Sequence, residues 1–284
     1  MFKKIFFAAA LLLASELIAK PVVIASIAPV EYLAKAVGGD KIEVHRLAKG
    51  DVHSYEPKPN DMKAVAKARI FIAAGLEFEE AWIPRFKASA KNLVVVKSDA
   101  KIAKLKEERG EQAEHDEKHE AHADPHVWLN PMLAITMARN ISDALIDMDK
   151  ANKDFYLENF QKLMNDLLAF DESAKNELAG LKNRKFVVYH PAWGYFAAHY
   201  DLEQISIERS GKEPKIDEMA STLKMIKDEN IKVIFADPNR SQKSAQILAS
   251  QTGAKVELLD PLGYNLLENL KIAVGAIKDA NSPK

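Results

Sequence analysis

Cysteine is absent from all 284 residues of the chain. The chain can therefore form no disulfide bond, which removes the usual covalent support of small exported proteins. It also cannot carry a lipid on a cysteine thiol. A lipoprotein is thereby excluded.

An excess of charge of either sign is also lacking. The 40 lysine and arginine residues are balanced by 41 aspartate and glutamate residues, which leaves a formal net charge of −1. Proteins that bind nucleic acid usually present a surplus of positive charge to the phosphates. We therefore expect no nucleic-acid partner.

Long apolar runs are missing except near the N-terminus. There, Lys3 and Lys4 precede nine apolar residues from Ile5 to Leu13, and Ala19 offers a small residue for cleavage. This pattern is typical of a signal peptide and predicts export to the periplasm with residues 1–19 removed. A membrane anchor is the alternative, but a helix that spans a bilayer needs about 20 apolar residues.

Short apolar runs alternate with helix-like segments in two parts of the chain, residues 20–150 and 183–284. Continuous apolar strands separated by helices indicate a parallel sheet that is covered on both faces. We therefore predict an α/β fold with two lobes, each a mainly parallel four-stranded sheet flanked by helices. The expected strands are 22–27, 42–47, 70–74, 93–96, 186–189, 204–207, 231–235 and 256–259, and the expected helices in the lobes are 30–37, 59–68, 216–227, 241–251 and 266–277.

Residues 151–182 are predicted to form one long helix between the lobes. From Tyr156 to Leu181 the apolar residues recur every three or four positions, and no glycine or proline interrupts 151–179. A helix of about 30 residues is about 45 Å long, enough to reach along both lobes. A rigid connection of this kind favours small lobe shifts over a wide hinge motion.

Four potential metal ligands follow strand-like runs that lie far apart in the sequence. They are His53, His126, His190 and Asp260. Ligands of parallel α/β sheets gather beyond the carboxyl ends of the strands, so we expect these side chains to meet in the cleft between the lobes. Three imidazoles and one carboxylate form a set that Zn²⁺ prefers.

Each of these residues also has a plain structural interpretation. A single histidine is more often a surface or hydrogen-bonded core residue than a ligand, and Asp260 could simply begin a turn before Pro261. The matching positions of all four favour the metal site. For His45 and His199 we favour structural roles over metal contact, and for Glu56 a role in holding a loop by hydrogen bonds over a role as a general base.

The segment from Glu107 to Asp124 differs in composition from the rest. It holds eight acidic residues together with His115, His119 and His122. Such a composition is typical of a solvated loop. The alternative is that these imidazoles capture metal weakly and pass it to a tight site near His126.

Several motifs resemble a known family along nearly the whole chain after the signal peptide. They are HSYEPKPND around His53, DPHVWLNP around His126, VVYHPAWGYFAAHY around His190, FADPNRS at 235–241 and LDPLG at 259–263. The chain is similar to the periplasmic metal-binding components of zinc and manganese ABC importers, the cluster A-I binding proteins.

The resemblance implies two α/β lobes joined by one long helix, with the metal between them. It implies His53, His126 and His190 as ligands, and Asp260 matches an aspartate that completes the site in some members. A histidine at 190 resembles the zinc branch of the family. Some zinc binders have glutamate where this chain has Val52, so the fourth ligand stays open between Asp260, water and a loop histidine.

The resulting expectation is a monomeric periplasmic carrier, not an enzyme, that binds Zn²⁺ and delivers it to the membrane permease of an ABC importer. Two alternatives remain, a manganese carrier on the same fold and a secreted zinc hydrolase. No HExxH motif supports the hydrolase, because the histidines of HEAH at 119–122 are only three residues apart.

Since a histidine ligand must be neutral, zinc affinity is expected to fall as the pH drops through about 6.5.

Overall fold

The computed structural model describes residues 20–106, 123–208 and 216–281. The predicted signal peptide and His115, His119 and His122 lie outside these ranges. Within them, no helix combines the length and the apolar character needed to cross a membrane.

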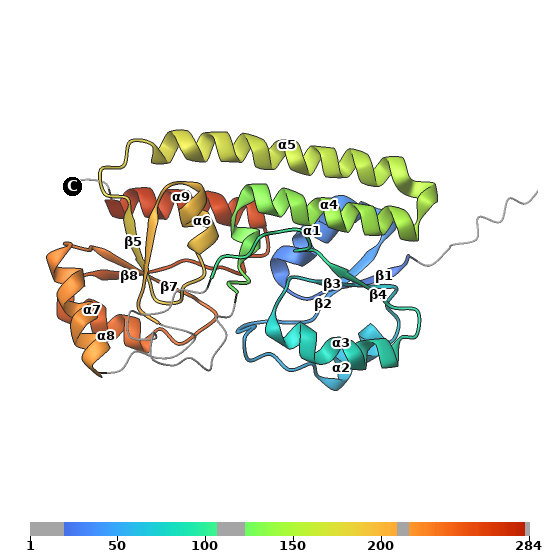
Figure 1. The fold of residues 1–284 in the computed structure, drawn as a ribbon, viewed down its shortest axis with the longest axis horizontal. Coiled ribbons are helices and arrows are strands. Elements are labelled where there is room, and N and C mark those ends of the chain that lie inside the picture. Colours follow the sequence, from blue (N-terminus) through green and yellow to red (C-terminus); the bar gives the residue numbers. More distant parts are fainter. Residues whose placement is uncertain (1–19, 107–122, 209–215, 282–284) are drawn as a thin grey trace, which may run out of the picture.

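Two separate four-stranded sheets form the centre of the molecule (Figure 1). The first has the strand order β2-β1-β3-β4 and the second β6-β5-β7-β8, and every strand pair is parallel. The strands are β1 (Val22–Ala25), β2 (Glu43–Arg46), β3 (Ile70–Ala73), β4 (Val94–Lys97), β5 (Lys185–Val188), β6 (Glu203–Ser206), β7 (Val233–Ala236) and β8 (Lys255–Leu258). The predicted fold class is confirmed, and each predicted strand lies within two residues of an observed one.

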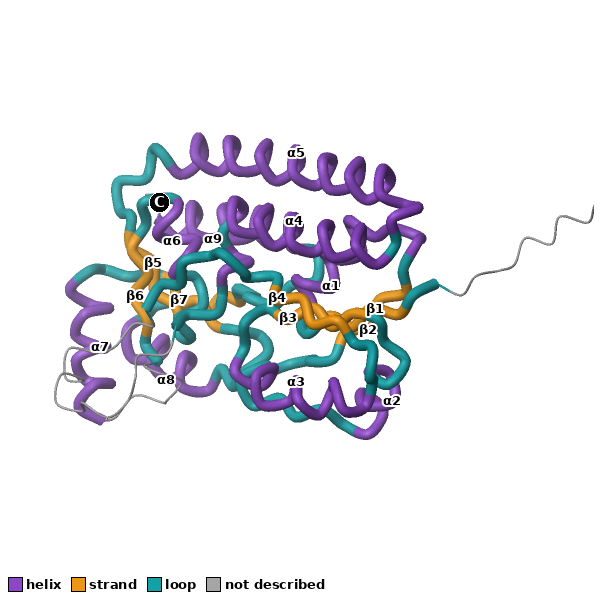
Figure 2. Tube along the Cα trace, turned by 45° about the vertical axis from the view of Figure 1, so that its right-hand side comes forward, coloured by secondary structure: helices purple, strands orange, loops and turns teal. Residues whose placement is uncertain are grey.

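Helices cover both faces of each sheet, as buried parallel strands require. Helices α2 and α3 lie on one face of the first sheet and α7 and α8 on the same side of the second, while α1, α4, α5, α6 and α9 form the opposite layer (Figures 1 and 2). Their bounds are α1 (Ala28–Gly38), α2 (Pro59–Val65), α3 (Glu77–Ser89), α4 (Pro131–Met148), α5 (Lys153–Leu178), α6 (Gly194–His199), α7 (Ile216–Asp228), α8 (Lys243–Thr252) and α9 (Leu266–Asn281), with short 3-10 turns η1 (Gly39–Lys41), η3 (Val127–Leu129) and η4 (Lys150–Asn152).

The long helix α5 joins the two halves, as predicted from its apolar stripe. It has 26 residues, which corresponds to about 39 Å, and it packs against α1 and α4 of the first half and α9 of the second. Its buried side chains belong to one hydrophobic core that includes residues of both sheets. Two smaller cores lie beneath the individual sheets. The two halves therefore share their largest core through the layer that contains α5.

Helices α3 and α4, and the short helix α6, lie outside the helix ranges expected from the sequence. Helix α3 contains Pro84 and has charged residues throughout, which weakens its apolar pattern. Helix α4 begins with a clear signal, because the Asn130 side chain accepts hydrogen bonds from the amides of Met132 and Leu133, and Pro131 occupies the first turn. Its start overlaps the motif DPHVWLNP.

Helix α5 offers a direct test of the shared core. Leu167 is fully buried on α5, whereas the adjacent Leu168 is 40% exposed. We expect Leu167→Ala to lower the free energy of unfolding by about 2–5 kcal/mol, because it leaves a cavity. The matched control Leu168→Ala should change it by about 0.5 kcal/mol or less. Urea unfolding of the zinc-free protein measures both, and equal effects would contradict a core that runs through α5.

Candidate metal centre

Three of the four predicted ligands meet at the carboxyl ends of strands from both sheets. His53 lies in the loop after β2, His126 just before η3, and His190 just after β5. One nitrogen from each ring lies within 4.8 Å of the others. The ring centroids are 5.1 to 5.5 Å apart. A tetrahedral Zn²⁺ with bonds of about 2.0–2.1 Å would place its nitrogen ligands about 3.3 Å apart, so small side-chain movements complete the site.

His126 is held by the carboxylate of Asp124. The side chain of His126 is buried, and its Nδ1 lies 2.7 Å from Asp124 Oδ1, which also accepts a hydrogen bond from the His126 amide. A carboxylate on one imidazole nitrogen fixes the ring and leaves the other nitrogen for a metal. Gly194 leaves room for this carboxylate, since a Cβ there would lie 3.1 Å from Asp124 Oδ2.

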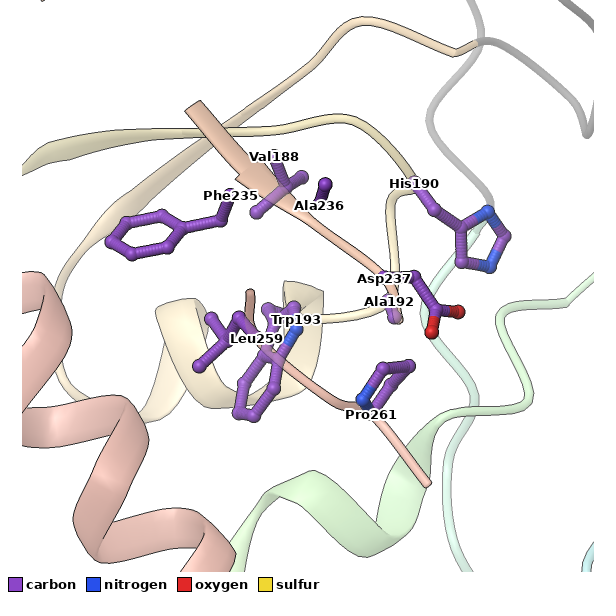
Figure 3. Close-up of a pocket in the computed structure, with 9 residues that line it drawn as sticks. All are labelled: Val188, His190, Ala192, Trp193, Phe235, Ala236, Asp237, Leu259 and Pro261. Carbon is purple, nitrogen blue, oxygen red and sulfur yellow. The ribbon is translucent and has the colours of Figure 1, made fainter. Parts of the chain in front are cut away.

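His190 is held in the same way by Glu208. Both side chains are buried, and His190 Nδ1 lies 2.8 Å from Glu208 Oε2. The other nitrogen, Nε2, is buried with no hydrogen-bond partner among the described residues. A buried polar atom without a partner is costly, and a metal ion bound by Nε2 would satisfy it. Figure 3 shows His190 and Asp237 at one end of a small pocket whose other end is lined by apolar side chains.

The electrostatic environment keeps His53 and His190 neutral. His53 is exposed as a residue, but the loss of water around its ring is the largest cause that lowers its pKa to about 4, and the neighbouring His126 and Arg240 act in the same direction. The same three causes hold the pKa of His190 well below its ordinary value. For these two rings, protonation is therefore expected below the pH of about 6.5 at which an ordinary histidine titrates, and the pH dependence of zinc affinity stays a prediction.

A pH titration tests this conclusion. In the zinc-free protein we expect the ring protons of His53, followed by NMR, to titrate with a midpoint near 4. Because the unfolded chain binds this proton near pH 6.5, it carries more protons than the folded protein between about pH 4 and 6.5. The free energy of unfolding should therefore fall as the pH is lowered through this window. A His53 midpoint near 6.5 would contradict the structure.

Asp260 was predicted as the fourth ligand. Among the described residues, His53, His126 and His190 bring their ligand atoms within 4.8 Å of one another, and Asp260 lies outside this group. It lies two residues after β8, and its Oδ1 accepts hydrogen bonds from Asn239 Nδ2 at 2.7 Å and from the Leu262 amide at 2.8 Å. Its role as a fourth ligand thus stays a prediction.

The other two histidines among the described residues, His45 and His199, pair with carboxylates away from this group. His45 Nε2 lies 2.9 Å from Glu43 on the surface, and His199 Nε2 lies 2.6 Å from Asp171 of α5. Both contacts agree with the structural roles favoured from the sequence.

The sequence did not reveal the residues that orient the ligands. Asp124 stands two positions before His126 and could have been suspected from that spacing, since Asp-Pro-His is short enough for one side chain to reach the next ring. Glu208 and Arg240 are 18 and 50 positions from His190. Only the folded arrangement of the loops after β6 and β7 brings them to it.

Comparison with known proteins shows that the chain is similar to metal-binding proteins. The family model described as ZnuA, zinc-uptake complex component A periplasmic, matches residues 23–280. A putative metal-binding protein of Treponema pallidum is 33% identical over 243 residues, which cover 82% of this chain and 77% of that protein. The high-affinity zinc uptake system protein ZnuA of Bacillus subtilis is 30% identical over 279 residues, which cover 91% of this chain and 86% of that protein. A crystal structure of a ZnuA deletion mutant with zinc bound is similar with a TM-score of 0.86 and 34% identity, over 93% of this chain and 99% of that chain.

Proposed function

The chain belongs to the family of periplasmic zinc-uptake complex components A, and we propose that it captures Zn²⁺ in the periplasm and delivers it to the permease of an ABC importer. One observation carries the proposal. Three imidazole nitrogens lie within 4.8 Å of one another, and two of the rings are buried with their second nitrogen against a carboxylate.

The ligand set favours zinc over manganese. Neutral imidazoles suit Zn²⁺, whereas the harder Mn²⁺ prefers oxygen ligands. Asp124 and Glu208, the carboxylates in hydrogen-bond contact with the rings of His126 and His190, lie against the Nδ1 atoms. They therefore orient nitrogen ligands instead of supplying oxygen ones.

The same placement supports a carrier over a hydrolase. A zinc hydrolase needs a base close to a metal-bound water. Asp124 and Glu208 are instead engaged with ligand rings, and Asp260 is engaged with Asn239 and Leu262. These contacts hold a metal site in place.

Metal titration of residues 20–284 tests the function. Competition with a chromogenic chelator should give one tightly bound Zn²⁺ per chain and much weaker binding of Mn²⁺, with no turnover of ester or peptide substrates. Binding of Mn²⁺ as tight as that of Zn²⁺ would favour the manganese carrier, and zinc-dependent turnover would favour the hydrolase. In cells, loss of the gene should impair growth only when zinc is scarce.

The cellular form of the protein is part of the proposal. Residues 1–19 are removed on export, and the mature chain works as a monomer with an N-terminal lobe (20–150), a linking helix (151–182) and a C-terminal lobe (183–284). Mass spectrometry of the protein from a periplasmic extract should find Lys20 as the first residue. Size-exclusion chromatography with light scattering tests the monomer.

We further propose that the acidic, histidine-containing loop captures zinc for the tight site. The described residues at its two ends, Lys106 and Ala123, form an antiparallel bridge, and the Asp124 amide donates to Leu105 O at 2.9 Å. Both ends of the loop are therefore held next to the carboxylate that orients His126.

Deletion of residues 107–122 separates the two binding functions. We expect the shortened protein to keep its single tight zinc site and to lose additional, weaker zinc binding, because the ligands of the tight site lie outside the deletion. Zinc stoichiometry measured by calorimetry at high and low metal concentration checks this. Loss of the tight site on deletion would contradict the assignment of His53, His126 and His190.

A further inference from the structure

Arg240 forms a closed set of contacts with His190 and Glu208. The guanidinium Nη1 lies 2.8 Å from His190 Nδ1, and Nη2 donates to Glu208 Oε1 at 2.7 Å. Glu208 Oε2 lies 2.8 Å from the same Nδ1. Arg240 comes from the loop after β7 and Glu208 follows β6, so two loops of the second sheet converge on one ring nitrogen.

One imidazole nitrogen cannot satisfy both neighbours. A neutral histidine carries one N–H and one acceptor nitrogen. If Nδ1 carries the hydrogen, it donates to Glu208 and the N–H of Arg240 faces another N–H. If Nδ1 carries the lone pair, it accepts from Arg240 and lies against the carboxylate of Glu208. Each tautomer of the neutral ring therefore suits one partner and opposes the other.

Metal binding chooses between these tautomers. A metal on Nε2 needs the lone pair of that nitrogen, so the hydrogen must be on Nδ1 and donate to Glu208. Arg240 favours the opposite tautomer, in which Nε2 carries the hydrogen and cannot bind a metal. The guanidinium is also a positive charge in contact with a ligand ring, which disfavours a second cation.

We propose that Arg240 is a positioning residue that limits zinc affinity by competing with the metal for the tautomer of His190, and that it thereby makes release possible. This inference rests on the proposed zinc-carrier function. Glu208 acts in the opposite direction, because it stabilises the tautomer that binds metal. The ion pair between Arg240 and Glu208 holds the two competing groups together on the same ring.

The test compares substitutions at the two positions. Arg240→Met keeps much of the side-chain length and removes the donor and the charge, so we expect zinc to bind about tenfold more tightly and to dissociate correspondingly more slowly. Glu208→Gln should weaken binding by about 10–100-fold. Arg69→Met, at an exposed position just before β3, is the matched control and should bind like the wild type. Weaker or unchanged zinc binding in Arg240→Met would overturn the proposal.

A second readout reports the tautomer itself. The ¹⁵N chemical shifts of the His190 ring, assigned by comparison with His190→Gln, should show an acceptor Nδ1 in the zinc-free wild type and a protonated Nδ1 in Arg240→Met. If both proteins show a protonated Nδ1, the proposal is wrong. Arg240→Leu, which likewise removes the donor and the charge, gives the same comparison should the methionine variant fold poorly, and a wild-type tautomer there would also overturn it. A wild-type protein that binds no zinc would refute the carrier function. The tautomer measurement tests the proposed role of Arg240 separately, because it is made on the zinc-free protein.

Discussion

Alanine in place of any one of His53, His126 and His190 is expected to weaken zinc binding by about 100–1000-fold. Zinc sites with four protein ligands have apparent binding free energies of about 10–16 kcal/mol, so one ligand accounts for roughly 3–4 kcal/mol, and each 1.4 kcal/mol is a factor of ten. The loss should be greatest for His126 and His190. Both are buried and oriented by carboxylates, whereas His53 is exposed and water can take its place.

Competition with a chelator of known zinc affinity measures these losses. His45→Ala is the control, because His45 pairs with Glu43 on the surface and should bind zinc like the wild type. Asp260→Ala belongs in the same series. A loss as large as that of His53→Ala would make Asp260 the fourth ligand, and an unchanged affinity would leave that position to water. Wild-type affinity in all three histidine variants would refute the site.

The central strands of both sheets were predictable because their sequences are apolar at nearly every position. Runs such as Ile70–Ala73 and Val233–Ala236 are apolar at every position, and both are buried throughout. Such runs belong to parallel strands covered on both faces. The apolar stripe of α5 was equally clear. Helices α3 and α4 were missed because the first has a weak apolar stripe and the second starts within a motif that also carries His126.

The grouping of the three histidines was predictable for a related reason, which is that the carboxyl ends of parallel strands gather on one side of a sheet. That rule brings His53, His126 and His190 together without any knowledge of distances. It does not say which loops approach closely enough for hydrogen bonds. The contacts of Glu208 and Arg240 with His190 depend on such approaches, and so does the contact of Asn239 with Asp260.

Hydrogen bonds between the two halves lie close to the ligand His126. The Tyr195 hydroxyl donates to the carbonyl oxygen of Asp124 and accepts from the amide of Leu105, both at 2.8 Å. Trp128 Nε1 donates to the carbonyl oxygen of Pro261 at 2.7 Å. The segment that carries His126 is therefore hydrogen-bonded to the second half both before and after His126 in the sequence. Together with the shared core along α5, this favours small shifts of the lobes, as the long helix suggested.

Among the residues that make these contacts between the two halves, Trp128 is expected to contribute most to the free energy of unfolding. Its side chain is fully buried, and its ring lies 5.3 Å from that of His126. We expect Trp128→Ala to lower the free energy of unfolding of the zinc-free protein by about 3–5 kcal/mol, through the cavity that it leaves. Zinc affinity should fall as well, because the His126 ring loses the packing contact with the indole that helps to orient it.

Trp128→Phe separates packing from hydrogen bonding. Phenylalanine fills most of the space but leaves the Pro261 carbonyl without its donor, so the expected loss is smaller, about 1–3 kcal/mol. Trp82→Ala is the control, because Trp82 is only partly buried on α3 and lies outside the contact between the halves. Urea unfolding gives the stabilities and chelator competition the affinities. If Trp128→Ala lost less than Trp82→Ala, the contact between the halves could not be what holds His126 in place, and the ligand would have to be fixed by Asp124 alone.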